Sequence, residues 1–223
     1  PTVVHIHTLK GRGYALAEAD RERFYWGMPF DLATGAPKSE AGAAEDYGDL
    51  TGRFLLERMA KDPTLVAITS GTPAVMGFTP ERRKQAGRQF VDVGIAEEHA
   101  VALASGIAAN GGRPVYGVYS TFIQRCYDQL SQDLCINGNP AVIPVFMGTI
   151  AGMNDVTHLG FFDIPLISNI PNMVYLAPTC KEEYFAMLGW AIRQREYPVA
   201  VRVPGATVVE SGRNFDTDYS ELN

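Results

Sequence analysis

Glu97 is a candidate catalytic carboxyl group at a point where a buried strand gives way to a helix. It lies in the segment 92–100, DVGIAEEHA, in which Gly94 turns the chain before the helix opens. A carboxyl group with apolar neighbours can exchange a proton near neutral pH, because desolvation raises its pKa. Glu97 and Glu98 also suit the positive end of a helix dipole, a role worth under about 1 kcal/mol. Spacing alone favours this second interpretation.

Other residues with chemical potential have ordinary alternatives. His158 precedes a glycine in a loop, where a histidine is more often solvated or capping. Phe122 could belong to a core stripe, and Arg125 could pair with Asp128 at helical spacing. His5 and His7 share one face of a short apolar run, but two ligands without a third are weak evidence for a metal. We predict no metal ligand in this chain.

The elements that position these residues alternate along the chain. Helical patterns separate six apolar, β-branched runs that predict strands, at residues 65–69, 90–93, 115–119, 142–146, 173–176 and 199–203. Such alternation predicts an α/β fold, a three-layer α/β/α domain around a parallel sheet of about six strands. Ligands of such sheets bind at the carboxyl ends of the strands, where the candidate residues fall.

Two helices are predicted at residues 96–109 and 181–193. A third shows a buried stripe stepping by three and four residues, formed by Ile123, Cys126, Tyr127, Leu130 and Leu134. Three cysteines at wide spacing suit neither a disulfide framework nor a zinc site. We therefore interpret those in predicted helices as small buried hydrophobic residues, and expect a reducing cytoplasm.

The first part of the chain has a different texture. Residues 3–6 predict a short strand, but residues 15–47 show no sustained period. We interpret residues 1–47 as a strand end and an irregular linker arm from a missing N-terminal domain. Residues 48–210 then form the α/β domain, and residues 211–223 begin a linker to a missing C-terminal domain. The chain is thus expected to be a piece of a longer protein.

The charge balance excludes some partners. Nineteen Lys and Arg residues stand against 25 Asp and Glu residues, giving a formal charge of −6. A nucleic-acid or anionic-membrane surface needs clustered positive charge, so neither is predicted. No apolar run approaches the roughly 20 residues that a membrane span requires.

Motifs along nearly the whole chain, in order, resemble transketolase-type thiamine-diphosphate enzymes, and among them the deoxyxylulose-phosphate synthases. Besides DVGIAEEHA, the matching motifs are KGRGYA at 10–15, FDLATG at 30–35, YSTFIQRCYDQ at 119–129, THLGFFD at 157–163, IPNMV at 170–174 and APT at 177–179. The resemblance implies the pyrimidine-binding middle domain of such an enzyme. The implied cofactor is thiamine diphosphate, with Mg²⁺ whose ligands are expected on the missing N-terminal domain.

The resemblance also implies roles for individual residues. Glu97 would hydrogen-bond N1′ of the aminopyrimidine and help the cofactor's own amino group to deprotonate the thiazolium. Apolar neighbours, including Ile95, would raise the pKa of Glu97 by desolvation, and Ile95 would also contact the cofactor. Phe122 would stack on the ring and Tyr119 would line its pocket. Arg125 would lie in a polar network beside the ring, and His158 would face the substrate.

Departures from the family fall on the acceptor side. Trp26 stands where the family has a histidine, and Met147 where it has an arginine. An aspartate is replaced by Asn154 or displaced to Asp155, and a second arginine near Arg202 is missing. Trp26, Asn154 and Asp155 are therefore substrate-site candidates, and the enzyme is expected to use an altered acceptor.

The expected enzyme joins a two-carbon unit from a 2-oxo acid or ketose to an aldehyde acceptor, and works as a homodimer on small-molecule substrates. Alternatives are a transketolase-like sugar transferase or a 2-oxo-acid dehydrogenase component. An alternative from another class is a non-catalytic dimerisation module. The chain alone is expected to be inactive, because the diphosphate-binding motif occurs nowhere in it.

Overall fold

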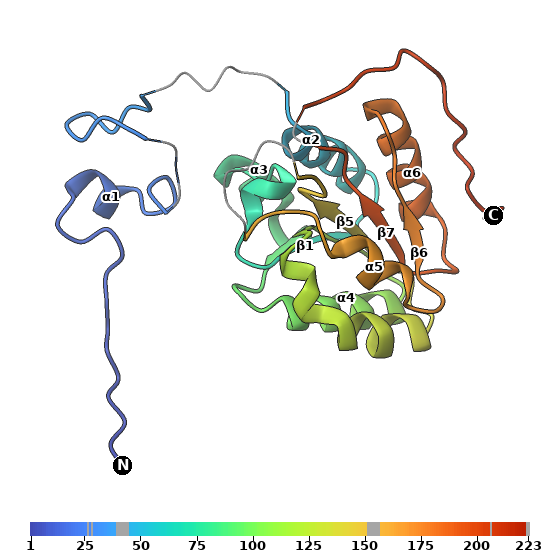
Figure 1. Cartoon of the computed structure of the whole chain (residues 1–223), viewed down its shortest axis with the longest axis horizontal. Coiled ribbons are helices and arrows are strands. Elements are labelled where there is room, and N and C mark those ends of the chain that lie inside the picture. Colours follow the sequence, from blue (N-terminus) through green and yellow to red (C-terminus); the bar gives the residue numbers. More distant parts are fainter. Residues whose placement is uncertain (26, 28, 39–44, 151–156, 206, 222–223) are drawn as a thin grey trace. The chain divides into compact units, whose positions relative to one another are not determined.

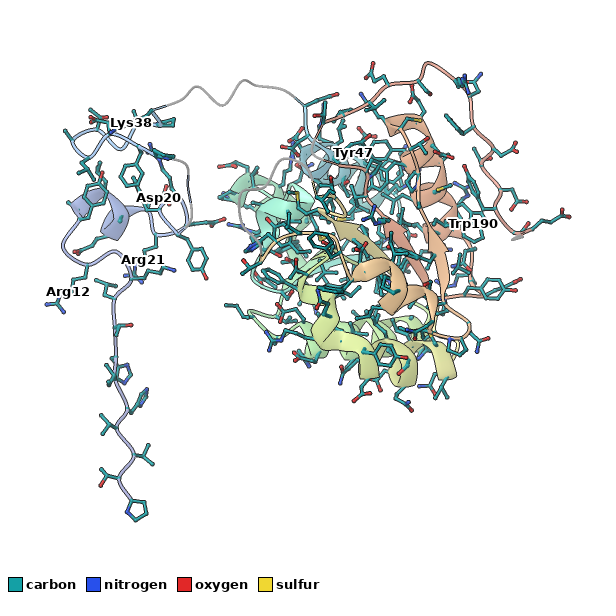
Figure 2. The ribbon with its side chains drawn as sticks, viewed as in Figure 1. Arg12, Asp20, Arg21, Lys38, Tyr47 and Trp190 are labelled. Atoms are coloured by element: carbon teal, nitrogen blue, oxygen red, sulfur yellow. The ribbon has the colours of Figure 1, made fainter. Side chains whose placement is uncertain are left out.

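The computed structural model describes residues 1–25, 27, 29–38, 45–150, 157–205 and 207–221. They belong to two compact units, Pro1–Ala44 and Glu45–Asn223. The first unit holds one short helix, α1 (Ala15–Ala19), and a cluster of three rings. Tyr14 lies 5.4 Å from Phe24 and 5.9 Å from Phe30, measured between ring centroids. Polar side chains of this unit, including Arg12 and Lys38, are exposed (Figure 2).

The strand predicted at residues 3–6 is wrong. These residues are described without secondary structure, and Val3 is 96% exposed and Ile6 72% exposed. A strand needs a neighbour for its backbone N–H and C=O groups, and no described strand pairs with this segment. β-branched composition alone does not make a strand.

The second unit is built on a parallel sheet of seven strands (Figure 1). The sheet order is β2-β1-β3-β5-β7-β6, and β4 pairs separately with β5. The strands are β1 (Leu65–Thr69), β2 (Phe90–Asp92), β3 (Arg113–Tyr116), β4 (Val118–Tyr119), β5 (Val142–Phe146), β6 (Val174–Leu176) and β7 (Val199–Arg202). Five of the six predicted runs therefore match one strand each, and the α/β fold with a parallel sheet is confirmed.

The remaining predicted run, residues 115–119, is divided at Gly117 into β3 and β4. A side chain at this position would collide with Met76, so only glycine lets the Met76 side chain pack there. The amide of Gly117 still donates to the carbonyl of Ile68 (3.1 Å). The chain consequently shifts between β3 and β4, which both pair with β5. This shift accounts for the seventh strand.

Helices cover both faces of the sheet (Figure 1). They are α2 (Tyr47–Met59), α3 (Pro80–Ala86), α4 (Glu97–Ala109), α5 (Asp163–Ser168) and α6 (Lys181–Arg193), with short 3₁₀ or π turns η1 (Pro73–Met76), η2 (Gly87–Gln89), η3 (Phe122–Cys126) and η4 (Gln129–Ile136). One core cluster packs α2 and α6 on one face, and a second packs α4, η3 and η4 on the other. The helix predicted at 181–193 is confirmed, and the one predicted at 96–109 begins one residue later.

The stripe predicted from Ile123 to Leu134 is buried except at one position. Four of its members are fully buried, whereas Tyr127 is 40% exposed and donates from its hydroxyl to Asn169 Oδ1 (2.7 Å). The segment is 3₁₀ at η3 and π at η4, so it does not keep a uniform period of 3.6 residues. Including Tyr127 in the stripe was wrong for this reason.

All three cysteines are free and buried, as small hydrophobic residues would be. Burial raises the pKa of Cys126 to about 12 and that of Cys135 to about 11, so both stay thiols at neutral pH. Among the described residues, no helix is long and apolar enough to cross a membrane.

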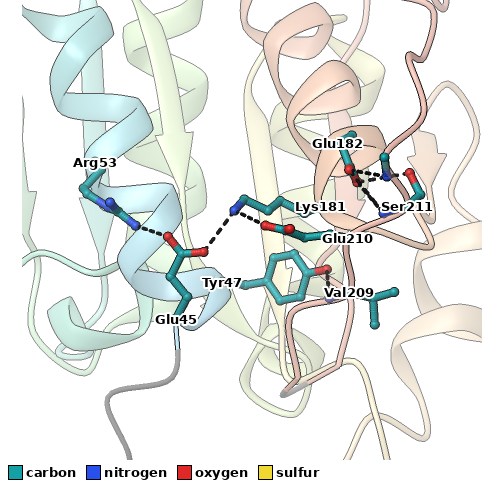
Figure 3. Close-up of polar contacts among 9 residues, drawn as sticks. Glu45, Tyr47, Arg53, Lys181, Glu182, Val209, Glu210 and Ser211 are labelled. Atoms are coloured by element: carbon teal, nitrogen blue, oxygen red, sulfur yellow. Dashed lines mark hydrogen bonds and ion pairs between the residues drawn. The ribbon is translucent and has the colours of Figure 1, made fainter.

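The segment after β7 is fastened to the first turn of α6 (Figure 3). The Glu182 carboxylate accepts hydrogen bonds from the amides of Ser211 (3.0 Å) and Gly212 (2.8 Å). Further along, Tyr219 packs on Trp190 of α6 at 6.0 Å between ring centroids, and Figure 2 shows Trp190 on the side of this segment. The segment therefore runs along α6 rather than leaving the domain at β7.

Candidate active site

The candidate site is built where β1 and β2 end. Oδ1 of Asp92, the last residue of β2, accepts the amide of Gly71 (2.8 Å) and the amide of Gly94 (2.9 Å). Gly94 has a φ of 72°, which glycine adopts without strain. This turn delivers the chain to α4, whose first residue is Glu97. The local sequence thus determines where the carboxyl group enters the site.

Glu97 is buried and ion-paired. The residue is 2% exposed, and its Oε2 lies 3.1 Å from Arg125 Nη1. Arg125 also lies 3.4 Å, through Nε, from Oε1 of the more exposed Glu98. Arg125 pairs with these two carboxylates, and Asp128 is not among its ion-pair partners in the described part of the chain. The guanidinium therefore offsets the cost of burying the Glu97 charge.

The same Glu97 oxygen lacks a hydrogen bond. Oε2 is buried, and its contact with Arg125 lacks hydrogen-bond geometry, so no described residue donates to it. Buried carboxylate oxygens without donors are uncommon and costly. The oxygen is thus available to a donor brought by a ligand.

An aromatic cluster forms the second part of the site. Tyr119, Phe122 and His158 contact one another edge to face, with centroid distances of 5.2 Å for Tyr119–Phe122, 5.6 Å for Tyr119–His158 and 5.2 Å for Phe122–His158. Burial raises the pKa of Tyr119. Phe122 and Arg125 lie on the same turn, η3, which links the aromatic cluster to the ion pair. The structure therefore brings five of the candidate residues to one place.

Ile95 has a different environment from its neighbours. It is 70% exposed, and it approaches the backbone of the turn at Gly71. Dry surroundings for Glu97 come instead from the fully buried Ala100 and Val101. An exposed isoleucine beside the site is free to contact a ligand.

The three predicted substrate-site residues, Trp26, Asn154 and Asp155, all lie outside the described residues. The remaining departure, Met147, is described and has an unusual backbone. Its φ is 55°, a left-handed value rare for a residue with a long side chain, and its carbonyl accepts from Ser120 Oγ (2.8 Å). A strained non-glycine residue at the end of β5 is typical of a functional loop.

Sequence reasoning missed three buried polar residues. Tyr116 Oη and Ser70 Oγ are 3.0 Å apart, and burial is the main cause that raises the pKa of Tyr116. Asp163, the first residue of α5, is fully buried. Acidic residues in a first helical turn are usually solvated, so the sequence carried no signal of this burial. No group of three or more His, Cys, Asp or Glu side chains in the described residues could hold a metal ion.

Comparisons with known proteins agree with this geometry. The family "Transketolase, pyrimidine binding domain" matches residues 44–208. The chain is 42% identical to a 1-deoxy-D-xylulose-5-phosphate synthase of Desulforudis audaxviator over 222 residues, covering 100% of the chain and 34% of that protein. It is 41% identical to the synthase of Clostridium tetani over 204 residues, covering 92% and 32%. The chain thus spans about a third of the length of these curated relatives.

Solved structures show the same fold at lower identity. A transketolase of Pichia stipitis in complex with sedoheptulose 7-phosphate gives a TM-score of 0.65 at 17% identity, covering 90% of this chain and 32% of that one. A structure described as "Split gene transketolase, inactive beta4 tetramer" gives 0.64 at 20% identity, covering 77% and 55%. The chain belongs to the transketolase pyrimidine-binding domain family.

Proposed function

We propose that the whole protein is a thiamine-diphosphate-dependent transferase of the 1-deoxy-D-xylulose-5-phosphate synthase type, and that this chain is the domain that holds the aminopyrimidine ring. The reaction would join a two-carbon unit, from a 2-oxo acid or a ketose, to an aldehyde. The observation that carries this proposal is the buried Glu97 oxygen without a hydrogen bond. The names of the relatives support the reaction type.

The described residues fit this cofactor. An aminopyrimidine offers a ring nitrogen that shares a proton with a carboxyl group, and a flat apolar face. Glu97 Oε2 supplies the oxygen, and the side chains of Tyr119 and Phe122 supply aromatic surface. When bound, thiamine diphosphate supplies the carbanion chemistry.

The chain's own residues would orient the ring and hold one proton beside its nitrogen. Glu97 would share that proton with the ring nitrogen through its buried oxygen. When the proton is on the ring, Arg125, 3.1 Å away, would compensate the charge of the carboxylate. Ile95 and Phe122 would exclude water from the ring faces. His158, against both Tyr119 and Phe122, would face the substrate.

The remaining parts of the enzyme belong, in this proposal, to sequence outside the α/β domain. Residues 1–47 would link it to an N-terminal domain that binds the diphosphate and Mg²⁺, and residues 211–223 would lead to a C-terminal domain. The threefold greater length of the relatives supports this layout. The assembly would be a homodimer in the cytoplasm.

The acceptor site is proposed to differ from that of the synthases. Met147 stands where the family resemblance leads us to expect an arginine, and Trp26, Asn154 and Asp155 also stand where the family has other residues. Arg202 does not offer a spare cation, because its Nε lies 2.7 Å from Asp163. A less cationic pocket favours an unphosphorylated or more apolar aldehyde.

A second candidate is a non-catalytic assembly module. A solved structure of similar fold is described as an inactive tetramer, so domains of this kind can exist as assembled, inactive proteins. A non-catalytic module would not need a buried Glu97 oxygen without a hydrogen bond near an aromatic cluster. The enzyme is therefore the better supported proposal.

The experiment compares two neighbouring glutamates in the full-length protein. Glu97→Gln should lower kcat by at least about 100-fold with the circular dichroism spectrum unchanged, because an amide cannot share the ring-nitrogen proton. Glu98→Gln is the matched control and should change kcat by less than about threefold, because its side chain is 39% exposed. Equal, small effects of both changes would support the helix-dipole role and the assembly module instead.

A further inference from the structure

Asp163 and Arg202 form an ion pair that the proposed chemistry does not use. Asp163 Oδ2 accepts from Arg202 Nε (2.7 Å) and from Tyr175 Oη (3.0 Å). Asp163 is fully buried, and its Oδ1 has no hydrogen-bond partner among the described residues. Arg202 therefore provides most of the compensation for a carboxylate that water does not reach.

Two glycines let Arg202 lie directly beneath the loops of the site. A Cβ on Gly148 would come within 2.8 Å of Arg202 Cγ and 3.0 Å of its Nε. A Cβ on Gly160 would in turn come within 2.7 Å of the Gly148 backbone. The Arg202 side chain, Gly148 and Gly160 are thus packed so closely that neither glycine has room for a Cβ. Few alternative arrangements of these loops are compatible with such packing.

Hydrogen bonds fix the same stack. The amide of Gly160 donates to the carbonyl of Thr149 (3.0 Å), and Arg202 Nη2 donates weakly to the carbonyl of Gly160 (3.4 Å). One residue earlier, the carbonyl of Leu159 accepts from Thr121 Oγ1 (3.3 Å). The chain just after His158 is therefore held from both sides.

We propose that Asp163 and Arg202 are positioning residues that set the His158 ring against Tyr119 and Phe122. They act through Gly160, two residues from His158, and neither touches a reacting atom. The inference rests on the proposed function, which assigns the substrate-facing role to His158. A purely structural ion pair would change stability alone, whereas a positioning pair also changes the chemistry that passes through His158.

The test uses the full-length enzyme with Arg202→Lys, which keeps the charge but loses the fork that reaches Asp163 and Gly160. Arg113→Lys is the matched control: Arg113 also pairs with an aspartate (Asp62, 3.2 Å) and is similarly half-buried, but it begins β3, at the opposite end of the sheet. We expect Arg202→Lys to lower kcat at least about tenfold with the donor KM within twofold. Arg113→Lys should leave both unchanged.

A double-variant cycle decides whether the effect passes through His158. In a His158→Ala background, Arg202→Lys should lower kcat by less than about twofold further. An undiminished tenfold loss there would overturn the proposal, as would an unchanged kcat in the single variant. Tyr175→Phe, which removes only one hydrogen bond to Asp163, replaces Arg202→Lys if the latter does not fold.

A readout independent of activity separates this inference from the proposed function. With histidine-selective isotope labelling, the His158 ring signal carries shifts from the rings of Tyr119 and Phe122. It should move in Arg202→Lys and stay in place in Arg113→Lys, even if Glu97→Gln proves harmless. An unmoved His158 signal would refute the positioning role.

Discussion

Removing Arg125 should destabilise the chain far more than removing the charge of Glu97, although the two residues form one ion pair. Arg125→Met leaves a carboxylate that is 3% exposed without its cation and with an oxygen that accepts no hydrogen bond. Stranding a fully buried charge costs about 3–5 kcal/mol. Because the Arg125 side chain is 51% exposed, water can partly replace it, and we expect a cost of about 2–3 kcal/mol.

Glu97→Gln, the substitution at the other partner of this ion pair, leaves no buried charge without a partner. After Glu97→Gln, Arg125 keeps its contact with Glu98 at 3.4 Å and half of its surface in water. The free energy of unfolding should therefore change by less than about 1 kcal/mol. In the double variant no buried charge remains, so most of the loss caused by Arg125→Met should be recovered.

Urea unfolding of the four proteins measures these differences. With a slope of about 2 kcal/mol per molar urea, a loss of 2–3 kcal/mol lowers the midpoint by about 1 M or more. Glu97→Gln should stay within about 0.5 M of the parent. Equal losses for the two single variants, or a double variant as unstable as Arg125→Met, would refute the view that Glu97 is a costly buried carboxylate maintained for a ligand.

Three further predictions follow from the site and from the C-terminal segment. Calorimetry should find no saturable binding of thiamine diphosphate to the chain alone below millimolar concentration, because ring stacking contributes only about 1–3 kcal/mol; micromolar affinity would contradict this. In the full-length enzyme, kcat/KM for glyceraldehyde 3-phosphate should exceed that for glyceraldehyde by less than about 100-fold, because Met147 replaces an expected phosphate ligand. A larger preference would contradict the altered acceptor site and indicate the acceptor specificity of the synthases. Amide donors of Ser211 and Gly212 hold the pKa of Glu182 at about 2. The deprotonated carboxylate therefore stabilises this contact fully above the unfolded pKa of about 4.5, and that stabilisation is lost as pH falls toward 2. Exchange protection of these amides should decline below about pH 4.5, and Glu182→Gln, which loses the charge but keeps one acceptor oxygen, should weaken it at pH 7.

The fold could be predicted because its elements carry local signals. Apolar runs such as residues 142–146 are short, β-branched and buried on both faces, as central parallel strands are. The interruption at Gly117 depends on the Met76 side chain, which is distant in sequence. The exposure of Tyr127 depends on a π turn that no simple period describes. Long-range packing decided each of these outcomes.

The site was predictable only where its residues lie on elements with local sequence signals. Glu97, Phe122 and Arg125 lie on elements with clear sequence signals, and the structure brings them together with Tyr119 and His158. Asp163 and Arg202 are 39 residues apart, and their pairing depends on the order of strands in the sheet. No local pattern reports such a pair.

The segment before α2 and the segment after β7 meet at a single ammonium group (Figure 3). Lys181 Nζ lies 2.9 Å from Glu45 Oε2 and 2.7 Å from Glu210 Oε1. Glu45 is the second residue of the segment that matches the family, and Glu210 follows its last residue by two positions. A domain whose chain enters and leaves at one point can be inserted into another protein, or have its ends joined and be opened elsewhere, with little disturbance of its core. Because Tyr219 also packs on Trp190 of α6, a transplanted or recircularised domain should keep residues 45–221, with Lys181 holding the segments that enter and leave it together.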